Sequence, residues 1–144
     1  MKILIIYFSQ SGNTKKVVGM VEERLKSFNH IVMIRNALTA TTEHVMSNDL
    51  LLIGTPVHGY ILFRQKPAKE VREFLKHQLP HDLNGKAVIG FATYLFFPAG
   101  ALNPIKDAIK SKNGKIIGLF AQRRTNKTEL VEEIIKTINE SITV

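Results

Sequence analysis

The sequence predicts an α/β protein built on a doubly wound, five-stranded parallel sheet in a three-layer αβα arrangement. Short runs of Ile, Leu, Val and Phe without polar alternation indicate strands that are buried on both faces, as in parallel sheets. Amphipathic helical segments lie between these runs, and regular alternation of strand and helix is typical of this fold class. The 144 residues match the usual size of one domain and contain no linker-like stretch, so a single domain over residues 1–144 is expected. The sequence contains no cysteine, which excludes disulfides.

Five segments have the composition of buried strands, and four segments carry apolar residues at helical spacing. The predicted strands are residues 2–8, 31–35, 49–54, 86–92 and 115–121. The predicted helices are residues 14–27, 67–79, 102–113 and 127–142, with a short helix at most within 38–48. Ligands of such sheets bind beyond the carboxyl ends of the strands. The segments after the first, third and fourth predicted strands are therefore the candidate sites.

The segment after the first predicted strand brings three hydroxyl groups and a glycine to the start of a helix. Its residues are Ser9, Gln10, Ser11, Gly12, Asn13 and Thr14. The N–H groups at a helix N-terminus favour an anion, and glycine lets the backbone approach it closely. The segment lacks the glycine and lysine pattern of a Walker loop and the three glycines of the dinucleotide fingerprint. It predicts a phosphate site that uses neutral dipoles.

The run YFSQSGNTKKVV resembles the phosphate loop of flavodoxins, in which hydroxyl, hydroxyl, glycine and threonine hold set positions. Ser9, Ser11, Gly12 and Thr14 occupy those positions. The resemblance implies a flavodoxin-like fold of the short-chain type, with strand order 2-1-3-4-5. It also implies that the chain binds FMN.

The segment GTPVHGY, after the third predicted strand, resembles the flavodoxin loop that borders the isoalloxazine ring. By this resemblance the flavin is bordered by Thr55, Pro56, Val57, His58, Gly59 and Tyr60. Tyr60 is either a stacking residue or an exposed loop aromatic. His58 is either a proton source or, as the favoured reading, an ordinary polar residue. The Gly59–Tyr60 peptide is the candidate for a backbone flip that accompanies flavin reduction.

The segment GFATY…PAGAL, after the fourth predicted strand, resembles the flavodoxin region that binds the pyrimidine edge of the flavin. The resemblance points to Thr93, Tyr94, Phe97 and Gly100, with Tyr94 or Phe97 as a second stacking aromatic. The chain departs from the family pattern at Leu95, where a glycine is expected, and it lacks the usual acidic residues. The run from Leu95 to Phe97 is either a hydrophobic cover or a partner surface.

The resemblance implies an electron-transfer protein that shuttles electrons between redox proteins, with the redox chemistry supplied by FMN and with no catalytic side chain. The formal net charge is +8, whereas familiar flavodoxins are acidic. Residues 62–76 contain five basic and two acidic residues. This excess predicts a redox partner with an acidic docking face and a less negative potential for the second reduction step. A solvated basic surface is the alternative interpretation of the charge.

The main alternative is an FMN-dependent oxidoreductase that uses NAD(P)H and a quinone or flavin acceptor, so the question of enzyme activity stays open. A response-regulator receiver is rejected, because Ser9, Gln10 and Thr55 stand where acidic residues are needed. Nucleic-acid binding is not expected without a recognised motif, and neither is a metal site. No apolar run has the length of a membrane helix or a signal peptide, so a cytoplasmic location without membrane insertion is expected.

Overall fold

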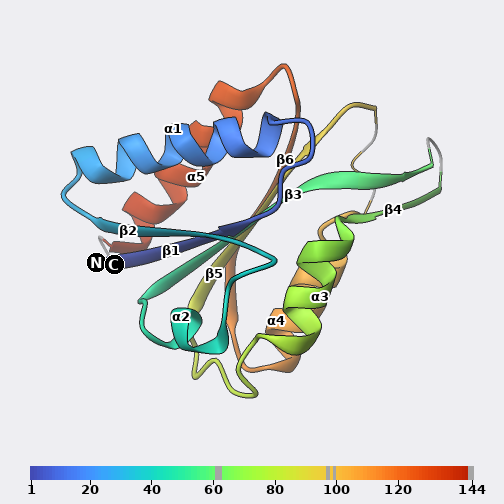
Figure 1. Cartoon of the computed structure of the whole chain (residues 1–144). Coiled ribbons are helices and arrows are strands. Elements are labelled where there is room, and N and C mark those ends of the chain that lie inside the picture. The colour runs from blue at the N-terminus through green and yellow to red at the C-terminus, as the bar shows by residue number, and fades with distance from the viewer. Residues whose placement is uncertain (61–62, 97, 99, 143–144) are drawn as a thin grey trace.

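A computed structural model describes residues 1–60, 63–96, 98 and 100–142, the side chains of residues 58–60, 63 and 64 excepted (Figure 1). Strands and helices alternate along most of the chain, as the sequence predicts. The elements are β1 (Lys2–Tyr7), α1 (Asn13–Ser27), β2 (Ile31–Asn36), α2 (Thr42–Met46), β3 (Leu50–Tyr60), β4 (Phe63–Pro67), α3 (Lys69–His77), β5 (Ala87–Tyr94), α4 (Asn103–Ser111), β6 (Lys115–Arg123) and α5 (Lys127–Ile142).

The central sheet is parallel and has the strand order β2-β1-β3-β5-β6. This is the predicted order 2-1-3-4-5, because the fourth and fifth predicted strands are β5 and β6. The prediction of five strands misses β4, which pairs antiparallel with the end of β3. The pairing joins Val57 to Pro67 and His58 to Lys66, and the resulting hairpin projects from the sheet (Figure 1).

Residues 54–60 were predicted to be a loop, and this prediction is wrong. Strand β3 continues to Tyr60, because β4 supplies partners for backbone groups that would otherwise need water. The same pairing delays the next helix. Pro67 belongs to β4, and α3 begins at Lys69 with Ala68 as its N-cap rather than at residue 67.

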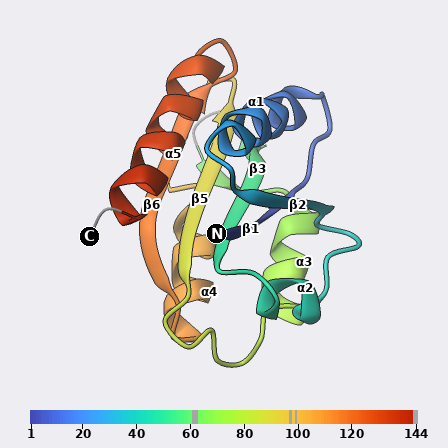
Figure 2. The same cartoon turned by 90° about the vertical axis from the view of Figure 1, so that its left-hand side faces the viewer.

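The strands bury both faces under two helical layers, so the three-layer prediction is confirmed. Helices α1 and α5 cover one face, and α3 and α4 cover the other (Figures 1 and 2). In β1, Ile3 and Ile5 belong to the core under α1 and α5, whereas Leu4 and Ile6 belong to the core under α3 and α4. This alternation follows from the two-residue period of side chains along a strand.

Short local signals account for the smaller helical elements. Helix α2 is the short helix expected within residues 38–48, and it begins with a capping box between Thr41 and His44. Helix α5 has the predicted bounds, and the ends of α1 and α4 differ by one or two residues from those predicted. Over the described ranges, no helix is long and apolar enough to cross a bilayer.

Candidate functional site

The turn between β1 and α1 has the backbone conformation of an anion-binding helix N-terminus. Gly12 is the N-cap of α1, with φ of +90°, a left-handed conformation that favours glycine. Apart from Gly12 itself and its two chain neighbours, no atom of the described residues lies within 4 Å of the position that a Cβ at Gly12 would take. The N–H groups of Asn13 and Thr14 have no acceptor within the helix because they belong to its first turn. The turn therefore offers donors beside open space.

Side chains of the same turn hold its shape. The Oγ of Ser9 accepts a hydrogen bond from the N–H of Lys15 at 3.2 Å. The amide nitrogen of Asn13 donates to the Oγ of Ser11 at 2.8 Å. Gln10 and Ser11 are exposed, whereas Ser9 is half-buried. Ser9, Gln10, Ser11 and Asn13 were predicted from the sequence to bind phosphate, and they lie together in this turn.

A pair of buried threonines links this turn to the segment that follows β5. Thr14 lies in the first turn of α1 and is 1 % exposed, and Thr93 in β5 is fully buried. Their hydroxyl oxygens lie 3.2 Å apart, within hydrogen-bonding distance. Two predicted site residues separated by 79 positions are thus in contact. The contact sets the position of the β1–α1 turn relative to the end of β5.

Thr55 is fully buried and both hydrogen-bonding functions of its hydroxyl are used inside the protein. Its Oγ1 accepts from the N–H of Ala68 and donates to the carbonyl of Pro56, each at 2.8 Å. These bonds fasten the start of α3 to β3. Thr55 thus positions the hairpin segment, and its hydroxyl is not available to a ligand. Pro56 is also buried, and Val57 packs against the core under α3 and α4.

Gly54 lies where β3 and β5 pack closely together, and the sequence alone does not show why a glycine is needed there. A Cβ at this position would lie 2.3 Å from the ring of Phe91 on the neighbouring strand β5. The buried Phe91 ring thus occupies the space of a side chain directly below the candidate site. The backbone of Gly54 also accepts a hydrogen bond from the N–H of Phe8 at 3.2 Å. This glycine allows β3 and β5 to approach where the site begins.

The segment after β5 exposes apolar side chains at the carboxyl edge of the sheet. Tyr94 is half-buried, whereas Leu95 and Phe96 are 52 % and 54 % exposed. The two predicted roles of this run, a hydrophobic cover or a partner surface, stay predictions. Gly100 has φ of +71° and accepts a hydrogen bond from the N–H of Asn103 at 3.0 Å, just before α4 begins. Phe97 lies outside the described residues.

Two arginines at the end of β6 were missed as neighbours of the site. Strand β6 extends to Arg123, which pairs with Tyr94, and the N–H of Arg124 donates to the carbonyl of Tyr94 at 2.9 Å. Within the part of the chain that the structure describes, the buried Nε of Arg124 has no hydrogen-bond partner. Two adjacent arginines after an apolar strand were the available signal. They place positive charge at the same edge as the predicted site.

The three predicted segments leave the neighbouring strands β1, β3 and β5 at the same edge of the sheet. The side chains of His58, Gly59 and Tyr60 lie outside the described part, although their backbone belongs to β3. A doubly wound sheet with a helix N-terminus ready for an anion at this edge defines the class of mononucleotide-binding α/β proteins.

Comparison with known proteins identifies the family. A family model described as a flavodoxin domain matches residues 4–135, and the chain belongs to this family. A curated protein named flavodoxin from Aquifex aeolicus (strain VF5) is 34 % identical over 67 residues. That match covers 45 % of this chain and 36 % of the relative, so it spans about a third of the relative's length.

Solved structures share the fold over almost the whole chain. Oxidised flavodoxin 2 from Bacillus cereus superposes with a TM-score of 0.81, at 20 % identity, over 98 % of this chain and 99 % of the other. Two-electron reduced flavodoxin from Megasphaera elsdenii gives a TM-score of 0.73, at 22 % identity, over 85 % of each chain. The flavodoxin-like fold predicted from the sequence is confirmed.

FMN is the cofactor that membership of this family implies, and the residues of the carboxyl edge fit it. The β1–α1 turn offers N–H and hydroxyl donors beside open space, which suits a phosphate group. The segments after β3 and β5 provide backbone and aromatic groups at the same edge, which suits a flat ring. The fit rests on neutral donors, because no lysine or arginine lies within residues 9–14.

Proposed function

We propose that this protein is a one-electron carrier that binds FMN at the carboxyl edge of its sheet and serves redox partners with acidic docking faces. The contact between Thr14 and Thr93, at 3.2 Å, carries the proposal. It joins the phosphate-binding turn to the segment expected at the flavin ring, so both ends of one mononucleotide meet a single preformed edge.

The proposed roles divide the site into a phosphate end and a ring end. At the phosphate end, backbone N–H groups and short hydroxyls bind the anion. At the ring end, FMN is bordered by the end of β3 and by the segment after β5. The residues proposed to border FMN are Ser9, Gln10, Ser11, Gly12, Asn13, Thr14, Thr55, Pro56, Val57, His58, Gly59, Tyr60, Thr93, Tyr94, Phe97 and Gly100.

FMN supplies the electron transfer when it is bound, and this chain positions the ring and shields part of it from water. The Gly59–Tyr60 peptide is proposed to turn its carbonyl toward the ring upon reduction, because glycine tolerates the change in backbone angles. The exposed side chains of Leu95 and Phe96 support a partner-facing role for this edge. The basic charge supports an acidic partner, and a cytoplasmic location stays a prediction from the sequence.

The phosphate end is tested by comparing FMN with riboflavin, which lacks the phosphate. In the variant Ser9→Ala, Ser11→Ala, we expect FMN to bind about tenfold more weakly, because two hydroxyl contacts to an anion are lost. Riboflavin binding, measured by quenching of flavin fluorescence, is the matched control and should change little. An equal loss for both ligands, or none for FMN, would contradict the assignment.

Stepwise reduction separates the carrier from the alternative NAD(P)H-dependent oxidoreductase. The protein is reconstituted with FMN and titrated with dithionite while the visible spectrum is recorded. A carrier should accumulate the one-electron-reduced form and should not oxidise NAD(P)H. Direct two-electron reduction with NAD(P)H turnover would favour the oxidoreductase, and absence of FMN binding would reject both.

A further inference from the structure

The face of the molecule formed by α3 and α4 carries a groove that the cofactor site does not use. The two helices pack against each other on the same face of the sheet (Figures 1 and 2). The groove between them has a volume of about 420 Å³. Its floor is apolar, with Leu75 from α3 and Pro104 and Ala108 from α4.

Cations border this floor. Arg72 and Lys76 line the groove from α3, and Lys112, just after α4, lines it at the far end. Over the described ranges, no ion pair involves any of these three side chains. The hydrogen bonds given for two of them go to backbone carbonyls: Arg72 Nε donates to Pro67 at 3.2 Å, and Lys112 Nζ to Leu79 at 3.4 Å. Over the described ranges, none of these three cations is therefore paired directly with a carboxylate.

An apolar floor bordered by basic side chains that form no described ion pair favours one kind of occupant. Amphipathic helices bind in grooves by placing an apolar stripe on the floor, and acidic residues beside that stripe would meet the cations. We propose that the groove between α3 and α4 docks an acidic amphipathic helix of the redox partner. The identity of the occupant as a redox partner rests on the proposed function, whereas the binding chemistry of the groove does not.

The position of the groove suits such a partner. Helix α3 begins where the β3–β4 hairpin ends, and α4 begins after the exposed segment that follows β5. Pro104 and Arg72 line the groove near these ends. A helix seated in the groove would therefore hold its protein beside the carboxyl edge of the sheet.

The test uses a synthetic helical peptide with leucines along one stripe and glutamates elsewhere, added to the full chain without FMN at physiological salt. Binding is measured by fluorescence anisotropy and mapped by amide chemical shifts. We expect saturable binding with the largest shifts around Leu75 and Ala108. A twin peptide with alanine in place of leucine should bind at least about fivefold more weakly, because the apolar floor is no longer filled.

Paired charge variants test the location. Arg72→Gln, Lys76→Gln should weaken binding about fivefold, because two rim contacts are lost. Lys106→Gln, Lys110→Gln removes the same charge at the same spacing on α4, from residues that do not line the groove, and should bind as the parent does. Lys76→Gln alone, with an unfolding curve, is used if the double variant folds poorly.

Equal loss in both pairs, equal binding of both peptides, or no binding at all would overturn the docking proposal. Because FMN takes no part in the measurement, failure of the electron-carrier proposal is recognised separately, by the reduction experiment. If the groove binds the leucine peptide but the protein does not bind FMN, the docking proposal stands and the electron-carrier proposal is rejected.

Discussion

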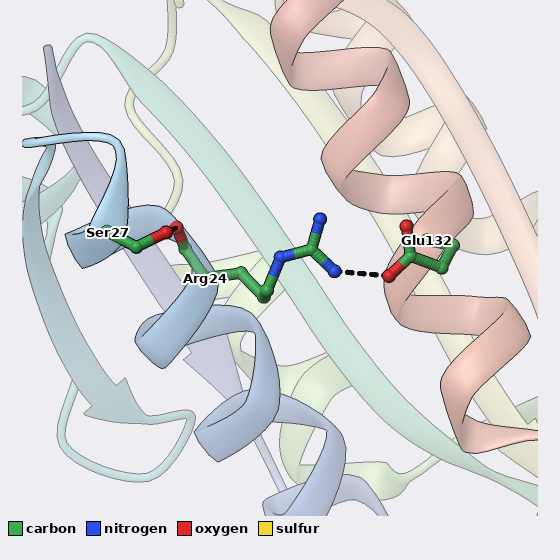
Figure 3. Close-up of polar contacts among 3 residues, drawn as sticks. All are labelled: Arg24, Ser27 and Glu132. Atoms are coloured by element: carbon green, nitrogen blue, oxygen red, sulfur yellow. Dashed lines mark hydrogen bonds and ion pairs between the residues drawn. The ribbon is translucent and has the colours of Figure 1, made fainter.

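The two helical faces of the sheet differ in how their charges are compensated. Helices α1 and α5 together contain six basic and six acidic residues, and Arg24 of α1 pairs with Glu132 of α5 (Figure 3). Helices α3 and α4 contain five basic and three acidic residues, and the ion pair described within them joins His77 to Glu73. On the first face an ion pair joins the two helices, whereas on the second face the described ion pair lies within α3 and the two helices keep a net positive charge.

The largest expected effect tests whether the faces differ in charge alone. Ile134 of α5 and Ile109 of α4 are both fully buried, in the two separate cores. Replacement of either by alanine should lower the free energy of unfolding by about 2–5 kcal/mol, because each leaves a cavity in a packed core. Urea unfolding measures both. A much smaller loss of unfolding free energy for Ile109→Ala than for Ile134→Ala would show that the two faces differ in packing as well as in charge.

The buried threonines at the carboxyl edge should give the next largest effect. Thr55→Val leaves the N–H of the buried Ala68 without an acceptor, at a cost of about 1–3 kcal/mol. Thr14→Val breaks the contact with Thr93 on the α1 face and should cost about 1 kcal/mol. Unfolding without FMN compares the two. A larger loss for Thr14 would place the critical polar contact on the other face.

The pair between Arg24 and Glu132 should contribute less, because both side chains are largely exposed. A double-mutant cycle with Arg24→Gln and Glu132→Gln should give a coupling of about 0.2–1 kcal/mol that falls in high salt. Lys76→Gln, which removes a cation with no described ion pair, is the comparable change on the opposite face and should leave stability nearly unchanged. A coupling that salt does not reduce would contradict the surface electrostatic explanation.

Lowering the pH should give the smallest change in stability, and two groups should cause it in two separate pH ranges. Partial burial, and to a lesser extent the charged amino terminus, lowers the pKa of His30 below its ordinary value. The unfolded chain therefore takes up this proton first, and stability declines as pH falls below about 6.5. His30→Gln should flatten that decline in urea unfolding between pH 7.5 and 5. An unchanged slope would assign the decline to other groups.

Asp82, in the loop between α3 and β5, should act at lower pH. Hydrogen bonds from Asn113 and from the N–H of Asn84 lower the pKa of Asp82. Its contribution to stability is present above the ordinary value of an aspartate and is lost as pH falls through the folded-state pKa. Asp82→Asn should reduce the additional loss of stability below about pH 4. Loss of this step in His30→Gln instead would contradict the assignment.

Local patterns predicted most of the fold because they report burial directly. The continuous apolar runs of β1, β3 and β5 identified strands covered on both faces, and the phosphate-loop motif identified the turn at Gly12. The same approach failed at residues 54–67. The pairing of Val57 with Pro67 depends on a second strand ten residues away, and no period within either strand indicates it.

The sequence placed the three predicted site segments at one edge of the sheet, but it did not predict the contacts among them. The order of strands and the motif at Ser9 and Thr14 placed three segments at one edge. Two of these contacts depend on how separate elements pack. The hydroxyl of Thr55 accepts a hydrogen bond from the N–H of Ala68, and the N–H of Arg124 donates to the carbonyl of Tyr94.

The sequence by itself determined the fold class, the tight turn at Gly12 and the basic character of the protein, because these depend on residue type and short-range spacing. Tertiary structure alone decided which charges are compensated. Arg24 meets Glu132 across 108 positions, because α1 and α5 cover the same face, whereas Arg72 and Lys76 line a groove where no acid reaches them within the described residues. The sequence gives the number of charged side chains, but the packing of the helices decides which of them lie next to one another on the surface.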